Sequence, residues 1–235
     1  MLLEAIDLEF KVGKTHILRK IALGVDGGEV VGLLGRNGSG KSSILKNLIG
    51  IYRPTRGVIR FRDQDIAQWP ARRRVGAGLA YSPEDTRVFP DLTVKENILL
   101  GTWVLEGMGR PPSLGIENAM DVFPALGNLL DRRGAQLSGG EKKMVSIARA
   151  LALSPSLLLL DESFEGLAPL VVRHFIDAMK NIRSMGVSIL LAESNLRNAS
   201  LVVDRAYVLE RGEIIFQGSP EQIEKDQRIM MIVGR

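Results

Sequence analysis

The segment Gly35–Ser42 constrains this chain most, because it reads Gly-Arg-Asn-Gly-Ser-Gly-Lys-Ser and matches G-x-x-x-x-G-K-[ST] at every fixed position. The short apolar run Glu29–Leu34 before it is typical of a buried strand, and apolar residues at helical spacing follow it. Glycines let successive backbone N–H groups point around phosphate oxygens, and the start of a helix adds its positive dipole end. Strand, glycine loop and helix in this order predict a phosphate-binding loop in an α/β fold.

Two side chains of this loop have roles of their own. Lys41 is expected to reach the β- and γ-phosphates of a nucleotide, and Ser42 to bind Mg²⁺ through its hydroxyl. The alternative is a chance match in a tight glycine turn, which the strand–helix context disfavours. The predicted nucleotide-binding residues are Gly35, Arg36, Asn37, Gly38, Ser39, Gly40, Lys41, Ser42 and Ser43.

Other periodic segments extend the α/β pattern. Ile6, Leu8 and Phe10 alternate with charged residues, as in a half-buried strand. Buried strands are predicted at Leu157–Leu160 and at Ser188–Ala192. A terminal hairpin is predicted from Ala206–Leu209 and Glu213–Phe216. Apolar stripes predict helices through Met144, Ile147, Ala148 and Leu151, and through Val172, Phe175, Ile176 and Met179. Alternating strands and helices favour a largely parallel sheet.

The stretch from about Thr93 to Arg133 is helical in pattern and is broken by Gly107–Gly115. It predicts a separate, smaller helical lobe. We therefore expect one domain, 1–235, with an α/β nucleotide-binding core at 1–92 and 155–235 and a helical subdomain at about 93–154. The core is expected to include an antiparallel β portion at its N-terminal end.

Composition narrows the possible functions. The chain has no cysteine, which excludes disulfides, zinc ribbons and thiol catalysis and is compatible with a reducing cytosol. The net charge of +4 fits solvated lysines and arginines or a face near an anionic membrane, and we expect no nucleic-acid partner. The first residues include acids where a signal peptide needs basic ones, and no apolar run approaches the roughly 20 residues that span a bilayer. A role at a membrane would thus be played from outside the lipid.

Two acids, Asp161 and Glu162, directly follow the buried run of leucines. Carboxylates emerging from a buried strand need a partner, and Mg²⁺ held by Asp161 through water would supply one. Glu162 would then face the γ-phosphate and polarise the attacking water. The alternative, a pair of acids capping the next helix, is weaker beside a phosphate loop.

The sequence Leu137-Ser138-Gly139-Gly140-Glu141 precedes the helix that contains Met144. A serine hydroxyl and glycine amides at a helix start form a second potential anion site, while simple capping by Ser138 is equally compatible with these residues. LSGGE, followed by Ile147-Ala148-Arg149-Ala150-Leu151 and by LLLLDE, resembles the signature region of ATP-binding cassette (ABC) ATPases. The resemblance to this family covers essentially the whole chain.

The narrower resemblance is to the second, smaller ATPase subunit of branched-chain amino-acid importers. It rests on Tyr81-Ser82-Pro83-Glu84, Arg87–Pro90, Leu92–Asn97, Gly166–Pro169 and Asp204–Glu210. It implies an ATPase with ATP and Mg²⁺ as cofactors, at the cytoplasmic face of the inner membrane. The implied partners are a second ABC ATPase subunit packed head to tail, two membrane-spanning permease subunits and an extracytoplasmic solute-binding protein. Ser138, Gly139, Gly140 and Glu141 would contact the ATP bound by the other ATPase subunit.

Several positions depart from the family pattern. Val12 stands where an aromatic residue usually stacks on adenine; Phe10 could take over, or the adenine contact is weakened. Glu84 replaces a glutamine that senses magnesium and water; its carboxylate can still bind Mg²⁺ but cannot donate a hydrogen bond. Ser194 stands where most relatives have a histidine that donates to the γ-phosphate, and neither His16, in an expected turn, nor His174, on an expected solvent face, can replace it.

These departures leave a second function open. In that hypothesis the chain is a nucleotide-binding partner whose own weak site turns over little, while another subunit hydrolyses ATP. Val12 and Ser194 favour it, and the intact Lys41, Asp161 and Glu162 oppose it. A cassette of DNA repair or translation is disfavoured, because two cassettes in one chain, long coiled coils and zinc inserts are missing from the sequence.

Overall fold

The centre of the molecule is a six-stranded sheet, which the computed structural model describes within residues 1–107 and 115–233. In spatial order its strands are β10 (Glu213–Gly218), β9 (Arg205–Glu210), β3 (Val30–Leu34), β8 (Ser188–Glu193), β7 (Leu157–Asp161) and β6 (Leu79–Ser82). All neighbours from β9 to β6 are parallel, and only β10 pairs antiparallel with β9. The predicted α/β core with a largely parallel sheet is therefore confirmed.

A second, antiparallel sheet is formed mainly by the N-terminal part of the chain. Its order is β2 (Thr15–Val25), β1 (Leu3–Val12), β4 (Arg56–Phe61) and β5 (Gln64–Asp65). The predicted first strand is confirmed, but the assignment of Ile6 to its buried face is wrong. Asp7 has a φ of 48° and lies where the pairing with β2 shifts register, so Ala5 is buried before this bulge and Leu8 after it.

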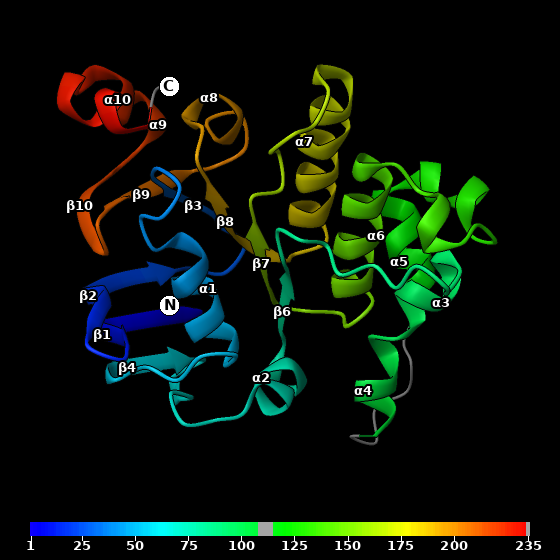
Figure 1. The fold of residues 1–235 in the computed structure, drawn as a ribbon, viewed down its shortest axis with the longest axis horizontal. Coiled ribbons are helices and arrows are strands. Elements are labelled where there is room, and N and C mark those ends of the chain that lie inside the picture. The colour runs from blue at the N-terminus through cyan, green and yellow to red at the C-terminus, as the bar shows by residue number, and fades with distance from the viewer. Residues whose placement is uncertain (108–114, 234–235) are drawn as a thin grey trace.

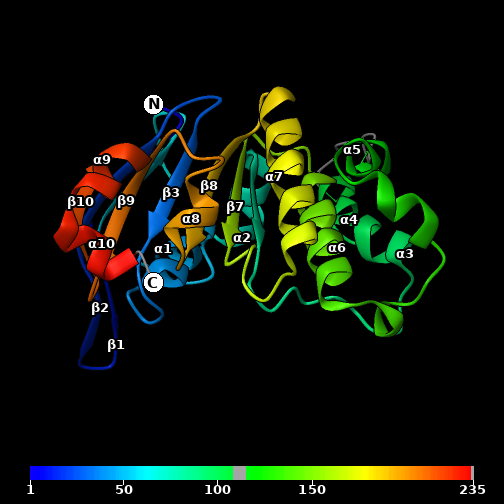
Figure 2. The same ribbon diagram turned by 90° about the horizontal axis from the view of Figure 1, so that it is seen from above.

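The helices cover both faces of the six-stranded sheet. Alternate leucines of β7 point to opposite sides: Leu157 and Leu159 pack with α1 (Lys41–Ile49) and the antiparallel sheet, whereas Leu158 and Leu160 pack with the helices beyond. In both ribbon views α1 and α6 (Gly139–Leu151) lie on either side of β7 (Figures 1 and 2). Because such a strand is buried on both faces, its sequence is a continuous apolar run.

Four further helices lie near α6 in Figure 1 and cover one side of the molecule with it: α3 (Val94–Leu99), α4 (Thr102–Glu106), α5 (Gly115–Val122) and α7 (Pro169–Ser184). Short 3-10 turns at Pro124–Leu129 and Gly134–Gln136 join α5 to α6. The predicted break at Gly107–Gly115 falls mostly on 108–114, outside the described residues. The remaining helices are α2 (Ala71–Ala77), α8 (Leu196–Ala199), α9 (Pro220–Lys225) and α10 (Gln227–Val233).

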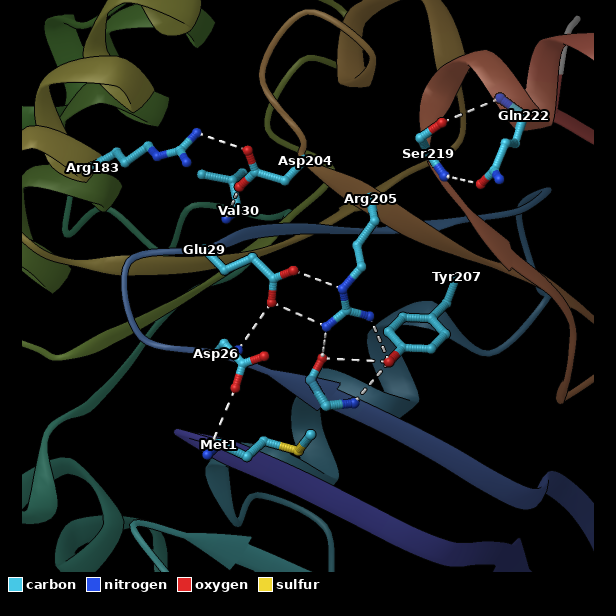
Figure 3. A network of polar contacts seen from close by, with 11 residues as sticks. Met1, Asp26, Glu29, Val30, Arg183, Asp204, Arg205, Tyr207, Ser219 and Gln222 are labelled. Atoms are coloured by element: carbon cyan, nitrogen blue, oxygen red, sulfur yellow. Dashed lines mark hydrogen bonds and ion pairs between the residues drawn. The ribbon is translucent and has the colours of Figure 1, made fainter.

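The two sheets are joined by a polar network around Arg205 (Figure 3). Its guanidinium donates to both carboxylate oxygens of Glu29, at 2.6 and 3.0 Å, and to the backbone carbonyl of Gly24 at 2.9 Å. The hydroxyl of Tyr207 accepts from Arg205 at 2.7 Å and from Gly24 N at 3.0 Å. A bidentate guanidinium–carboxylate pair is a strong contact. The contacts of Arg205 and Tyr207 with Gly24 hold the end of β2 against β9 and so link the two sheets.

Within the described residues, no helix combines the length and apolarity needed to cross a membrane.

Candidate active site

The phosphate loop runs from the end of β3 into α1, as the motif predicts. Gly38 and Gly40 have φ values of 80° and 114°, which favour glycine, and a Cβ on Gly40 would lie 2.9 Å from a methyl group of Leu18. The loop borders a cavity of about 420 Å³. Its lining residues are Ile17, Asn37, Gly38, Gly40, Lys41, Ser42, Ser43, Glu84 and Glu162. The fold thus brings the acid after β7 to the loop after β3.

Lys41 and Glu162, which both line this cavity, form an ion pair. Lys41 Nζ lies 2.8 Å from Glu162 Oε1, and the two side chains are only 4% and 5% exposed. The same ammonium donates to the carbonyl oxygens of Gly35, at 2.7 Å, and of Arg36, at 3.3 Å. A buried charge needs such partners. Lys41 is therefore held by the loop backbone and by the predicted catalytic carboxylate.

Asp161 accepts one hydrogen bond at each carboxylate oxygen. Ser42 Oγ donates to Oδ1 and the Tyr81 hydroxyl donates to Oδ2, both at 2.9 Å. Burial raises the pKa of Asp161, and these two hydrogen bonds oppose that shift. Burial and the adjoining Asp161 also raise the pKa of Tyr81 above its usual range. Tyr81, on β6, is a site residue that the sequence analysis did not identify, although it lies three residues before Glu84.

The oxygen atoms around Asp161 suit a hard cation. Ser42 Oγ and Asp161 Oδ1 are 2.9 Å apart, and hydroxyl and carboxylate oxygens are ligands that Mg²⁺ prefers. In the described part of the chain no group of three or more His, Asp or Glu side chains could hold a metal ion alone. Glu84 is exposed on the side that faces solvent and borders the same cavity; partial desolvation there, followed by the charge of Asp161, raises the pKa of its carboxyl.

Ser194 lies beside Glu162, as its position in the family pattern implies. It follows β8, and its Oγ donates to Glu162 Oε2 at 3.2 Å. Glu162 itself has a φ of 46°, a conformation that L residues adopt at a cost, and its N–H donates to Ala192 O at 2.9 Å. Both carboxylate oxygens of Glu162 are thus engaged, one by Lys41 and one by Ser194.

Two charged residues that the sequence analysis missed hold the backbone after β7. Lys143 Nζ, on α6, donates to the carbonyl oxygens of Glu162 and Glu165, the latter at 2.9 Å. Glu193, at the end of β8 and 2% exposed, accepts from Phe164 N at 3.0 Å. Burial raises the pKa of Glu193 to about 8, and burial lowers that of Lys143. Glu193 could have been found from the sequence, because it is an acid that directly follows the apolar run 188–192. No sequence pattern indicated Lys143.

The predicted signature residues lie at the start of α6. Ser138 caps the helix by accepting from Glu141 N at 3.3 Å, and Glu141 accepts in return from Ser138 N at 2.7 Å. The capping alternative is therefore observed. Gly139 is exposed, and a Cβ on Gly140 would lie 3.3 Å from Val171 at the start of α7. None of these four residues lines the cavity at the phosphate loop.

The adenine-contact candidates lie apart from that cavity. Val12 is 60% exposed at the end of β1 and is not among the lining residues. Phe10 is 9% exposed, and its ring stacks on Tyr52 with centroids 4.9 Å apart. The structure thus disfavours Phe10 as an exposed stacking ring. His16 pairs with Lys11 inside β2, so the turn expected there is wrong, whereas His174 is exposed as predicted.

Comparison with known proteins agrees with this geometry. The family model described as ABC transporter matches residues 18–165, well over half of the chain. The lipopolysaccharide export ATP-binding protein LptB of Acidithiobacillus ferridurans is 35% identical, covering 98% of this chain and 95% of LptB. The branched-chain amino acid transport ATP-binding protein BraG of Pseudomonas aeruginosa is 36% identical, covering 86% of each chain.

Solved structures show the same fold. The ADP conformation of MJ1267, an ATP-binding cassette of an ABC transporter, superposes with a TM-score of 0.86 over 98% of this chain and 97% of that one, at 24% identity. A structure described as the ATP binding subunit of an ABC transporter gives a TM-score of 0.82 at 29% identity, over 100% and 95% of the two chains. The chain therefore belongs to the ABC transporter family, as an ATP-binding cassette of the kind that hydrolyses ATP to power transport.

Proposed function

We propose that this chain binds MgATP at its phosphate loop and hydrolyses it to drive two membrane-spanning permease subunits. The observation that supports this most is the meeting of Lys41, Ser42, Asp161 and Glu162 around one cavity. Lys41 would bind phosphate oxygens, Ser42 and Asp161 would hold Mg²⁺ with Glu84 nearby, and Glu162 would orient the attacking water. Bound Mg²⁺ would neutralise charge on the phosphates.

Lys41 and Glu162 have to part for this reaction. Their ion pair of 2.8 Å occupies Oε1 of Glu162 and the charge of Lys41 together. When Lys41 donates to phosphate oxygens instead, Oε1 becomes free to accept a hydrogen bond from water. Ser194 Oγ, on the other oxygen, would keep the carboxylate oriented. ATP binding would thus convert Glu162 from a partner of Lys41 into a base.

For the assembly we propose a head-to-tail pair with a second ABC ATPase subunit, at the cytoplasmic face of the inner membrane. In it Ser138, Gly139, Gly140 and Glu141 would contact the other subunit's ATP. The core of 1–92 and 155–235 and the helical subdomain of about 93–154 would move relative to each other as the pair closes and opens.

The transported solute is proposed from the relatives. BraG and the segments Tyr81–Glu84 and Gly166–Pro169 favour import of branched-chain amino acids or a related small solute, with an extracytoplasmic solute-binding protein. LptB, which matches over 98% of this chain, favours lipopolysaccharide export as the second candidate. Affinity purification of the tagged chain with its permeases separates the two: a solute-binding protein that retains an amino acid supports import, and bound lipopolysaccharide supports export.

The weak-site hypothesis is the alternative mechanism. The exposed Val12 offers no ring for adenine, and the Ser194 hydroxyl is already engaged with Glu162. Both features would slow this subunit's own site. The complete set of Lys41, Ser42, Asp161 and Glu162 still favours hydrolysis.

The first prediction tests the phosphate loop. Lys41→Ala removes a charge-assisted contact worth roughly 1.5–3 kcal/mol, so MgATP affinity of the isolated chain is expected to fall at least tenfold. Nucleotide titration of the purified chain measures it, with Lys180→Ala on the exposed side of α7 as the control. Unchanged affinity in Lys41→Ala would rule out the proposed use of this loop.

A further inference from the structure

The backbone that follows β7 needs external support. Glu162 adopts a left-handed φ of 46°, a conformation that non-glycine residues rarely adopt, and the chain then turns toward α7. Its N–H is held by Ala192 O of β8 at 2.9 Å. Its carbonyl oxygen accepts from Lys143. The position of the Glu162 side chain depends on these two anchors, because its conformation is not one that the residue prefers.

Lys143 supports more than one point of this segment. The same ammonium donates to Glu165 O at 2.9 Å, so it spans the turn from Glu162 to Glu165. The buried carboxyl of Glu193, at the end of β8, accepts from Phe164 N of the same segment at 3.0 Å. The segment 162–165 is therefore clamped between α6 and β8.

The positive charge of Lys143 interacts with several acidic side chains of this region. Four carboxyl groups favour the charged form of this ammonium: Glu193, Glu165, Glu162 and Glu84. None of them makes an ion pair with it within the described ranges 1–107 and 115–233, where its hydrogen bonds go to backbone carbonyls. A cation at this position offsets the repulsion among acids that must stay close to one another. A neutral aliphatic side chain at this position would lose both the hydrogen bonds to the backbone carbonyls and the offset of this repulsion.

Lys143 also belongs to the helix that begins with the signature residues. Ser138 caps α6 through a reciprocal pair of hydrogen bonds with Glu141, so the first turn is rigidly tied to the cap. Gly140 lies against Val171, on the helix that follows the clamped segment. The signature residues and the ammonium that contacts Glu162 O thus lie on one helix, α6.

We propose that Lys143 is a positioning residue that couples the signature end of α6 to the backbone of Glu162. When the signature loop engages the other subunit's nucleotide, Lys143 holds Glu162 in the orientation that activates water at this subunit's own site. The inference rests on the proposed role of Glu162. It gives each site of the pair a direct physical link to the other through one helix.

The test replaces Lys143 with Met, which keeps the aliphatic stem and removes the ammonium. Lys142→Met is the matched control, since Lys142 is its neighbour on α6 and makes no such backbone contact in the described structure. The kcat for ATP hydrolysis is expected to fall about 10- to 100-fold with an unchanged KM, because a small misplacement of a catalytic group has that effect. Lys143→Arg is expected to restore part of kcat.

Hydrogen–deuterium exchange of the purified full chain provides a second readout that does not depend on turnover. The peptide covering residues 160–168 is expected to exchange faster in Lys143→Met than in Lys142→Met, with no change in peptides of the phosphate loop. Lys143→Gln, which removes the charge but keeps a donor, replaces Lys143→Met if that variant does not fold.

The possible results are distinct. Equal kcat values in Lys143→Met and Lys142→Met overturn the coupling, as does faster exchange without any loss of kcat. Equal losses of kcat and thermal stability in both variants overturn it as well. Glu162→Gln is measured in parallel: if it leaves hydrolysis intact, the proposed function fails together with the inference, whereas failure of Lys143→Met alone removes only the inference.

Discussion

Ser194 shows how a single side chain limits the chemistry available to this site. Its hydroxyl already donates to Glu162 Oε2 at 3.2 Å, so it is not free to donate to a phosphate oxygen. A missing donor to developing transition-state charge costs ~10²–10³-fold in rate. Ser194→His places a longer side chain with a ring N–H there, and we expect it to raise kcat roughly tenfold. The gain is smaller than the full effect of a donor because Glu162 loses the hydrogen bond from the Ser194 hydroxyl.

Steady-state hydrolysis by the purified chain measures this change, with Ser194→Ala and Glu162→Gln beside it. Ser194→Ala is expected to slow turnover, and Glu162→Gln to abolish it. Equal rates for Ser194→His and the unmodified chain would mean that Ser194 is not the limiting residue. If Glu162→Gln has no effect either, the weak-site hypothesis gains the advantage.

At the scale of elements, a buried arginine of α2 holds the end of α1. The Arg74 guanidinium donates to Asn47 O at 2.6 Å and Leu48 O at 2.8 Å at the end of α1, and to the carbonyl oxygens of Ala67 and Trp69. It is fully buried, and burial lowers its pKa to about 10. Because α1 begins at the phosphate loop, Arg74 supports the nucleotide site from the opposite end of the helix.

Arg74→Met is therefore expected to reduce the free energy of unfolding by about 3 kcal/mol or more, because four carbonyl groups lose a buried donor. Urea denaturation of the chain measures the loss. Arg72→Met, on the same helix but exposed, is the control and is expected to change stability by less than about 0.5 kcal/mol. Similar losses in both variants would contradict the capping role of Arg74.

The same elements show what the sequence could predict. β7 and β8 are buried on both faces and therefore appear as apolar runs, and the phosphate loop is one contiguous motif. β6 has only four residues, and the bulge at Asp7 arises from pairing with β2, so neither has a local pattern. Which of the arginines 72–74 enters the core depends likewise on carbonyl groups from distant segments.

At the scale of the whole molecule, the site contains residues that the sequence predicts and residues that it does not. Lys41, Ser42, Asp161 and Glu162 lie in motifs and were predicted to meet, as they do. Tyr81, Lys143 and Glu193 come from β6, α6 and β8, and they contact three different parts of one segment: the Asp161 carboxylate, the carbonyl groups of Glu162 and Glu165, and Phe164 N. Their roles could not be derived from spacing along the chain.

The position of the signature loop leads to the last prediction. Ser138 caps α6, which packs on the face of β7 opposite to α1, and it does not line the phosphate-loop cavity. If it serves the nucleotide of a second subunit, Ser138→Arg should suppress hydrolysis in the assembled transporter and leave MgATP affinity of the isolated chain unchanged. Ser138→Ala separates this effect from capping, since loss of the cap alone costs about 1 kcal/mol of stability. Weaker nucleotide binding by the isolated Ser138→Arg chain, at a stability equal to that of Ser138→Ala, would contradict the head-to-tail arrangement.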